Sequence, residues 1–256
     1  VAAGQKAVLP AIGGGELAEL GRALETMRTR LEDRAYVERY VHTLTHEMKS
    51  PLAAIHGAAE LLEEDMPAED RRRFMTHIRE QEERLRRLVE RMLGLASVEQ
   101  RQKLEHPERL SVAVLLESVL EGKAARFAAR KIRLEKVLVE DAFVIGEAFL
   151  LEQALSNLLD NALDFSPDDG AVSLAVHVEG EQVAVALRDR GDGVPDYARD
   201  RVFEPFYSLP RPDSGRKSTG LGLSFVKEVA ELHGGTVSLT NHPEGGAEAC
   251  LRLPRA

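Results

Sequence analysis

Residues 37–62 read VERYVHTLTHEMKSPLAAIHGAAELL. Apolar side chains recur in this stretch at steps of three, four and seven residues, with Leu44, Met48 and Ile55 on one face. Such spacing is typical of one face of an α-helix. It predicts a long helix that ends before the loop around Pro67.

A second apolar stripe begins beyond that loop and predicts a second helix. Its members are Phe74, Ile78, Leu85, Leu88, Met92 and Leu95. One partner alone cannot bury the stripes of such a hairpin, so residues 33–105 are expected to pair with a second copy as a dimeric four-helix bundle. The alternative is a monomeric helical arm that packs on the following domain.

The segments on either side of the hairpin have different patterns. Residues 1–32 contain a glycine-rich stretch and then apolar residues at steps of three and four, which are typical of a coiled coil. Residues 106–256 contain strand-like runs, such as 172–178 and 183–187. Helical stretches near 111–130, 147–164 and 222–233 are interleaved with them. We therefore expect an α+β multidomain chain whose second part is an α/β sandwich with a mixed or antiparallel sheet.

Composition limits the classes of function. The chain has 256 residues and a net charge of −9, which argues against general electrostatic attraction to nucleic acid or anionic lipid. A phosphate-bearing ligand must therefore be held by local donors. The single cysteine, Cys250, cannot form an intrachain disulfide. The sequence also contains no apolar run of about 18 residues that would span a membrane.

His46 stands out on the first predicted helix. At 100° per residue it lies roughly 200° from Leu44, so we expect its side chain to face solvent. Glu47 and Lys49 flank it, and Pro51, which disturbs helical hydrogen bonding, follows. A charged turn with a proline inside a regular stripe is the kind of local inconsistency that marks a functional site.

Five motifs together carry a resemblance to a known family. In chain order they are THEMKSPL (45–52), NLLDNA (157–162), DRGDG (189–193), FEPFY (203–207) and GLGL (220–223). They resemble the H, N, first glycine, F and second glycine boxes of the sensor histidine kinases of two-component systems. The stretch 36–60 is similar to the CreC type of these kinases. Residues 1–32 resemble part of a HAMP linker, and an ordinary dimeric coiled coil is the alternative for this segment.

The resemblance implies a fold and an activity. The hairpin would be a HisKA dimerisation domain, and residues 106–256 a HATPase_c domain of the GHKL (Bergerat) type. His46 would take the γ-phosphoryl group of ATP, with Mg²⁺ as a second cofactor, and pass it to an aspartate in the receiver domain of a response regulator. Glu47 would be the base that orients the histidine, and Ser50 would position water for phosphatase activity on the regulator. The chain would be the cytoplasmic portion of a homodimeric bacterial inner-membrane protein, joined to the membrane through segments absent from it.

The resemblance also implies the nucleotide contacts. Asn161 offers an amide oxygen suited to Mg²⁺, and Asn157, one turn earlier, can assist as a second metal ligand. Asp189 would accept a hydrogen bond from the adenine amine. The expected ATP-binding residues are Asn157, Asn161, Asp189, Gly191, Gly193, Phe203, Lys217, Thr219, Gly220, Leu221, Gly222 and Leu223.

Four positions depart from the family pattern. Ser50 stands where threonine or asparagine is commoner, and Asp164 stands where a basic residue is usual. Ser208 occupies a position that is often basic, and Ser218 replaces a glycine. At Asp164 a phosphate contact is either missing or supplied by the expected lid, residues 208–219.

Two other readings stay open at this point. The first is an ATP-hydrolysing relative such as gyrase, MutL or Hsp90, but Asn157 stands where those enzymes have a water-activating glutamate. The second is a pseudokinase that serves as a dimeric scaffold. The presence of His46, Asn161 and Asp189 argues against it.

Overall fold

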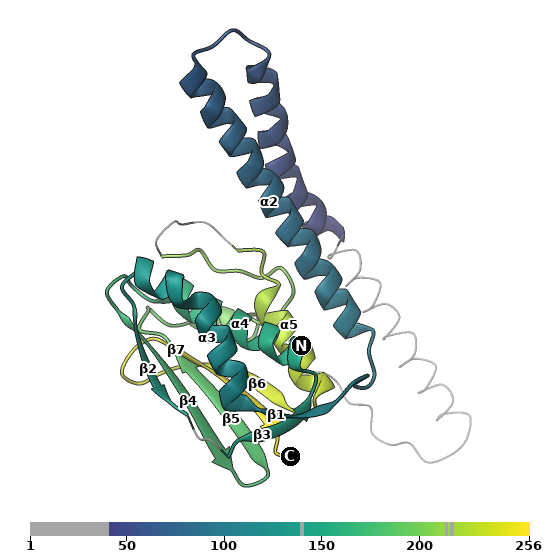
Figure 1. Cartoon of the computed structure of the whole chain (residues 1–256), viewed down its shortest axis with the longest axis vertical. Helices are drawn as coiled ribbons and strands as arrows, with labels where there is room; N and C mark the ends of the chain where they lie inside the picture. Colours follow the sequence, from purple (N-terminus) through teal and green to yellow (C-terminus); the bar gives the residue numbers. More distant parts are fainter. Residues whose placement is uncertain (1–40, 139–140, 213–214, 216–217) are drawn as a thin grey trace, which may run out of the picture.

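The computed structural model describes residues 41–138, 141–212, 215 and 218–256. A long helical hairpin is followed by an α/β domain (Figure 1). The coiled coil predicted within residues 1–32 and the expected ATP-binding residue Lys217 lie outside the described residues. Within the described part, no helix has both the length and the apolar character needed to cross a membrane.

The hairpin has the two helices that the apolar stripes predict. The described part of the first helix runs over residues 41–62 and continues through Pro51. The second helix, α2, covers Ala68–Glu99. Glu69 and Asp70 occupy its first turn, where carboxylates interact favourably with the positive end of the helix dipole.

The apolar side chains of the hairpin fall into two groups. Leu88 and Leu95 are buried in a core that continues into the α/β domain, and Leu44 and Met48 pack against that core. Other large apolar side chains remain exposed, namely Val41, Leu52, Leu61, Met75, Val89 and Leu93. A single chain therefore buries only part of the apolar surface of the hairpin.

A five-stranded mixed sheet, in the order β2-β4-β5-β7-β6, forms the base of the α/β domain. Strands β2 and β4 are parallel, and the other neighbouring pairs are antiparallel. A separate ribbon pairs β1 with β3. The strands are Glu108–Ser111 (β1), Arg133–Val137 (β2), Phe143–Gly146 (β3), Ala171–Glu179 (β4), Gln182–Arg188 (β5), Thr236–Asn241 (β6) and Ala247–Pro254 (β7). The sequence-based prediction of a mixed or antiparallel sheet is confirmed.

Helices α3 (Val112–Ala129), α4 (Ala148–Phe165) and α5 (Gly222–Leu232) lie over one face of this sheet (Figure 1). A short 3-10 turn covers Asp196–Ala198. Helix α4 is the central one, and its apolar side is fully buried. Its remaining side carries a polar stripe at helical spacing, made of Asn157, Asp160, Asn161 and Asp164.

The end of α2 is fastened to the α/β domain. Val98 is buried in the common core, and Glu147 receives a hydrogen bond from the backbone N–H of Glu105 (2.6 Å) and an ion pair from Arg101 (3.0 Å). Burial alone would raise the pKa of Glu147, but the backbone donors and Arg101 outweigh it and lower that pKa. These contacts join the C-terminal end of the hairpin to the start of α4.

Candidate nucleotide-binding site and phospho-acceptor

His46 lies exposed on the first helix, on the side that its spacing predicts. Its ring meets that of His42 edge to face, with the centroids 4.6 Å apart. Glu47 is half-buried, and its carboxylate lies 3.6 Å from the guanidinium of Arg84 on α2. Ser50 is exposed one turn after His46. The three expected catalytic residues thus lie on one helix. Glu47 forms an ion pair with Arg84, a residue that no motif contains.

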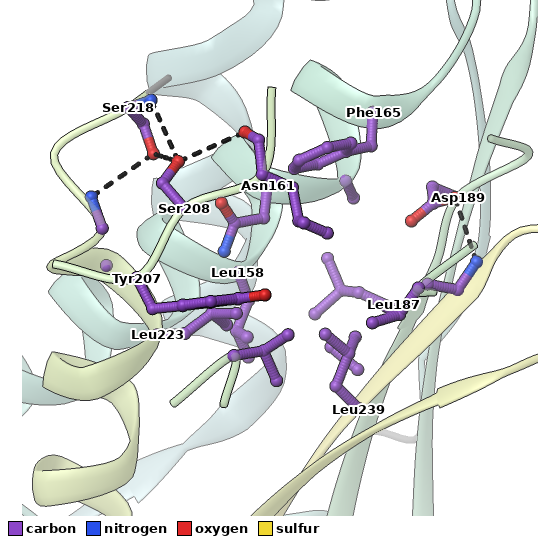
Figure 2. Close-up of a pocket in the computed structure, with 18 of the residues that line it drawn as sticks. Leu158, Asn161, Phe165, Leu187, Asp189, Tyr207, Ser208, Ser218, Leu223 and Leu239 are labelled. Atoms are coloured by element: carbon purple, nitrogen blue, oxygen red, sulfur yellow. Dashed lines mark hydrogen bonds between the residues drawn. The ribbon is translucent and has the colours of Figure 1, made fainter. Parts of the chain in front are cut away.

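A mostly apolar cavity lies between α4, the sheet and the segment before α5 (Figure 2). Its walls include Leu158 and Phe165 of α4, Leu187 and Leu239 of the sheet, and Tyr207. The rings of Phe165 and Tyr207 lie on opposite sides of the space in Figure 2. Such a cavity suits a flat heterocyclic ring.

The carboxylate of Asp189 lines this cavity, and the residue is 7% exposed. Its Oδ1 accepts hydrogen bonds from the backbone N–H groups of Gly191 (2.9 Å) and Ala247 (3.1 Å). Burial raises the pKa of Asp189, and the two backbone donors and Arg188 act in the opposite direction. Its Oδ2 has no hydrogen-bond partner among the described residues, so this oxygen can accept from a ligand.

The loop after Asp189 is fixed by Asn241, which no motif contains. Asn241 accepts a hydrogen bond from the N–H of Val194 (2.6 Å) and donates one to the carbonyl of Val194 (2.9 Å). Gly193 has a φ of +77°, and a Cβ there would come 2.8 Å from Asn241 Oδ1. A side chain at position 193 would therefore disturb both the left-handed turn and the clamp.

A polar cleft of about 410 Å³ adjoins the cavity and shares Asn161, Ser218 and Gly222 with it. Its charged and amide residues are Arg87, Arg91, Lys123, Arg126, Asn157, Asp160, Asn161, Asp164 and Arg211. Among the described residues, five cations and two carboxylates therefore meet here, in a chain whose net charge is −9. The cleft supplies the local positive charge that a phosphate-bearing ligand needs in an acidic protein.

The carboxylates of the cleft hold three of these cations. The Nζ atom of Lys123 lies 2.8 Å from Asp160, and Arg126 of α3 pairs with both Asp160 and Asp164. Arg211, in the segment before α5, also pairs with Asp164. Asp164 therefore brings two arginines to the place where the family pattern has one basic residue.

The two serine departures from that pattern contact each other. The Oγ atoms of Ser208 and Ser218 are 2.9 Å apart, and the N–H of Ser218 donates to Ser208 Oγ at 3.0 Å. Nearby, Gly220 has a φ of +67°, and a Cβ there would lie 2.4 Å from the carbonyl carbon of Phe206. Helix α5 begins at Gly222, which lines the cleft, so its free N–H groups lie beside the cleft.

The structure divides the expected ATP-binding residues between the two spaces. Those lining the cavity are Asp189, Gly193, Gly220 and Leu223, those lining the cleft are Asn157 and Thr219, and Asn161 and Gly222 line both. The other three expected residues that the structure describes line neither space. The backbone N–H of Gly191 donates a hydrogen bond to Asp189, Leu221 is buried in the core, and Phe203 packs in a small separate apolar cluster. Sequence reasoning missed Arg84, Arg91, Lys123, Arg126 and Asn241, because no motif or periodicity distinguishes them from other polar residues.

Two sequence families match the chain. Residues 36–101 match the His Kinase A (phospho-acceptor) domain, and residues 146–256 match the histidine kinase-, DNA gyrase B- and HSP90-like ATPase domain. The chain belongs to the sensor histidine kinases. The first match contains His46, and the second contains α4, both glycine motifs and α5. The ATPase-type domain implies that this histidine kinase core binds ATP.

Individual relatives agree with the family. Over 247 residues the chain is 49% identical to sensor protein CreC of Escherichia coli (strain K12), a match that covers 96% of this chain and 52% of CreC. The chain spans about half the length of curated relatives that it matches.

Solved structures share the fold. ShkA in complex with AMPPNP has a TM-score of 0.62 at 27% identity, over 84% of this chain and 45% of that one. Histidine kinase ThkA in complex with response regulator protein TrrA has a TM-score of 0.73 at 20% identity, over 91% of this chain and 66% of that one. The expected helical hairpin followed by a GHKL-type α/β domain is confirmed.

Proposed function

We propose that this histidine kinase core phosphorylates its own His46 from ATP and passes the phosphoryl group to an aspartate of a response-regulator receiver domain. One observation carries the proposal. An apolar cavity with a buried acid opens beside a cleft with five cations, on a chain whose attached hairpin presents an exposed histidine. The two spaces suit the base and the phosphates of one nucleotide.

In this assignment the adenine ring occupies the cavity between Phe165 and Tyr207. Its exocyclic amine donates to Oδ2 of Asp189, whose Oδ1 is already used by two backbone donors. The triphosphate lies in the polar cleft, where the N-terminal N–H groups of α5 and the nearby cations favour negative charge.

Asn161 and Asn157 are the residues that would hold Mg²⁺. They lie one turn apart on α4, and both line the polar cleft. Amide oxygens are hard neutral ligands, and Mg²⁺ usually keeps several waters while it binds phosphate oxygens. The donor set therefore fits this ion, which when bound would offset the charge of the phosphates.

His46 is the proposed nucleophile. A ring nitrogen of its neutral imidazole forms a bond to the γ-phosphorus, the bond from that phosphorus to the bridging oxygen breaks, and ADP leaves. Glu47 accepts the proton that the imidazole loses, and Arg84 orients its carboxylate. Ser50, exposed one turn away, holds water for hydrolysis of the phospho-aspartate of the regulator.

We extend the proposal to the oligomeric state of the chain, its division into domains and its location in the cell. A second copy of the hairpin would cover the exposed apolar side chains such as Leu52 and Val89. We infer a linker over residues 1–32, a dimerisation and phosphotransfer hairpin over 33–105, and an ATP-binding domain over 106–256. In the longer protein this part would lie on the cytoplasmic side of the inner membrane of a bacterium.

Incubation with Mg·ATP labelled at the γ-phosphate tests the proposed reaction. We expect label on the protein that is lost in acid and kept in base, as for a phosphorylated imidazole. Label that survives acid, or no label on a chain that binds ATP, would exclude histidine autophosphorylation.

A further inference from the structure

The five cations of the polar cleft differ in what holds them. Lys123, Arg126 and Arg211 pair with the carboxylates of the cleft, and Arg87 lies 3.3 Å from Glu83 on its own helix. Arg91 has no carboxylate partner among the described residues. Among the described cations of the cleft, it is therefore the one whose charge no carboxylate offsets by direct contact.

Arg91 also connects the helical hairpin to the α/β domain. It belongs to α2 of the hairpin, and its Nη1 donates a hydrogen bond of 3.2 Å to Oγ1 of Thr219 in the segment before α5. A guanidinium has five N–H donors, so this bond leaves most of them for a ligand. The hairpin thus delivers a cation to the end of α5 that lines the cleft.

We propose that Arg91 binds the distal phosphate of the nucleotide, so that the triphosphate joins the hairpin to the ATP-binding domain. The inference rests on the proposed function, because it takes the polar cleft to be the phosphate site. Arg126 and Arg211, gathered by Asp164, face the same phosphates from the ATP-binding domain. The nucleotide then has cations from both parts of the chain.

The position of Arg91 along α2 indicates whether this contact holds the phosphate near His46 or away from it. Arg84 of α2 contacts Glu47, which is next to His46 in the sequence. Arg84 and His46 therefore lie at about the same height along the hairpin. Arg91 lies seven residues further on, which is about 10 Å along the helix axis. A two-fold axis parallel to the hairpin would put the acceptor of a second chain at the same level. A phosphate bound to Arg91 therefore lies away from the histidine, and it must leave Arg91 before it can be transferred. We call this arrangement the stored state.

Nucleotide affinity tests the contact. In the His46→Gln background, which prevents transfer, calorimetry would compare ATP with adenosine for the parent, Arg91→Gln and Arg91→Lys. We expect Arg91→Gln to weaken ATP binding by about ten-fold, because a charge-assisted hydrogen bond is lost. Adenosine affinity should stay within about two-fold, because adenosine carries no phosphate, and Arg91→Lys should recover part of the ATP affinity.

Arg86→Gln is the matched control. Arg86 lies on the same helix, is exposed and pairs with Glu83 and Glu90 outside the cleft, so its loss should leave ATP affinity at the parent value. Equal ATP affinities for the parent and Arg91→Gln would overturn the inference, as would an equal loss for ATP and adenosine. A parent that binds no ATP would instead contradict the proposed function itself.

Autophosphorylation kinetics test the stored state in the chain with His46 intact. If Arg91 holds the phosphates away from the acceptor, Arg91→Gln should raise the KM for ATP and leave kcat at or above the parent value. A lower kcat at saturating ATP would show that Arg91 acts in the transfer step, and the stored state would be wrong.

Discussion

The carboxylate of Glu47 lies 3.6 Å from the guanidinium of Arg84, across the two helices of the hairpin. Both side chains are partly exposed, at 34% and 45%, so this ion pair adds little to stability. The pair places a positive charge beside the carboxylate next to His46, which favours one direction for that carboxylate.

Replacing Glu47 by glutamine should lower the rate of autophosphorylation by about 10²-fold, because an amide does not accept the imidazole proton. Arg84→Gln should cause a smaller loss of kcat and no change in the KM for ATP, because it acts only through Glu47. Initial rates of labelling would measure both effects. Arg79→Gln, an exposed arginine on the same helix, is the control. A Glu47→Gln rate close to that of the parent would contradict the role of Glu47 as base.

Ser50→Ala should separate kinase from phosphatase activity. The hydroxyl is one turn from His46 and exposed, so it can hold a water without contacting the imidazole. Autophosphorylation and transfer to the regulator should continue, while loss of label from the regulator slows. If the variant lost kinase activity and kept its phosphatase rate, the proposed division of labour would be wrong.

Asp189→Asn should weaken ATP binding by about ten- to a hundred-fold, because one charge-assisted hydrogen bond is lost. The amide oxygen can still accept from Gly191 and Ala247, so the loop should keep its shape. Calorimetry with ATP measures the effect, and Asp192→Asn, in the same loop but exposed, is the matched control. Equal affinities for the parent and Asp189→Asn would refute the contact with adenine.

Two adjacent substitutions on α2 should have different outcomes. Val89 is 42% exposed, so Val89→Glu should leave a folded chain and break the dimer. Leu88 is 2% exposed in the core, so Leu88→Glu should lower the stability of the fold itself, because it buries an unpaired charge. Light scattering and thermal unfolding distinguish the two. A folded Val89→Glu variant that remains a dimer would exclude this face as the interface.

His233 predicts an acid-sensitive fold. It is buried, its Nδ1 bonds the carbonyl of Val229 at 2.7 Å, and its Nε2 accepts the N–H of Glu147 at 3.1 Å. Burial lowers the pKa of His233 below its ordinary value, and the bond to Val229 opposes this effect. As the pH falls below about 6.5, the unfolded chain takes up the proton more readily, so the free energy of unfolding decreases until the lower folded pKa is passed.

Urea unfolding at pH 7.5 and at pH 5.5 would measure this loss. His233→Gln should show a smaller decrease between the two pH values, and His177→Gln, at an exposed position of β4, should show the decrease of the parent. A decrease of the same size in all three proteins would assign the pH dependence to other groups.

The sequence predicts the elements better than the contacts between them. Helical periodicity predicts the hairpin, and the polar stripe of α4 follows from the spacing of Asn157 and Asn161 within one helix. The bond between Arg91 and Thr219 joins residues 128 positions apart, and it depends on how α2 rotates and packs against α5. Periodicity along one helix contains no information about that packing.

The departures from the family pattern show the same limit. At sequence level, Asp164 indicates only that a cation is missing, whereas in three dimensions it binds Arg126 of α3 and Arg211 of the segment before α5. Ser208 and Ser218 are separate departures in the sequence, and yet they form one hydrogen-bonded pair. In both cases the partner lies far away in the sequence, so a single sequence does not reveal the contact.

Transfer of label from γ-labelled Mg·ATP to His46 is the measurement that tests the central claim most directly. The parent, His46→Gln and His42→Gln would be labelled in parallel, and His42 is a demanding control because its ring centroid lies 4.6 Å from that of His46. We predict acid-labile label on the parent and on His42→Gln, and none on His46→Gln. Unchanged labelling of His46→Gln would contradict the assignment of His46 as the phospho-acceptor.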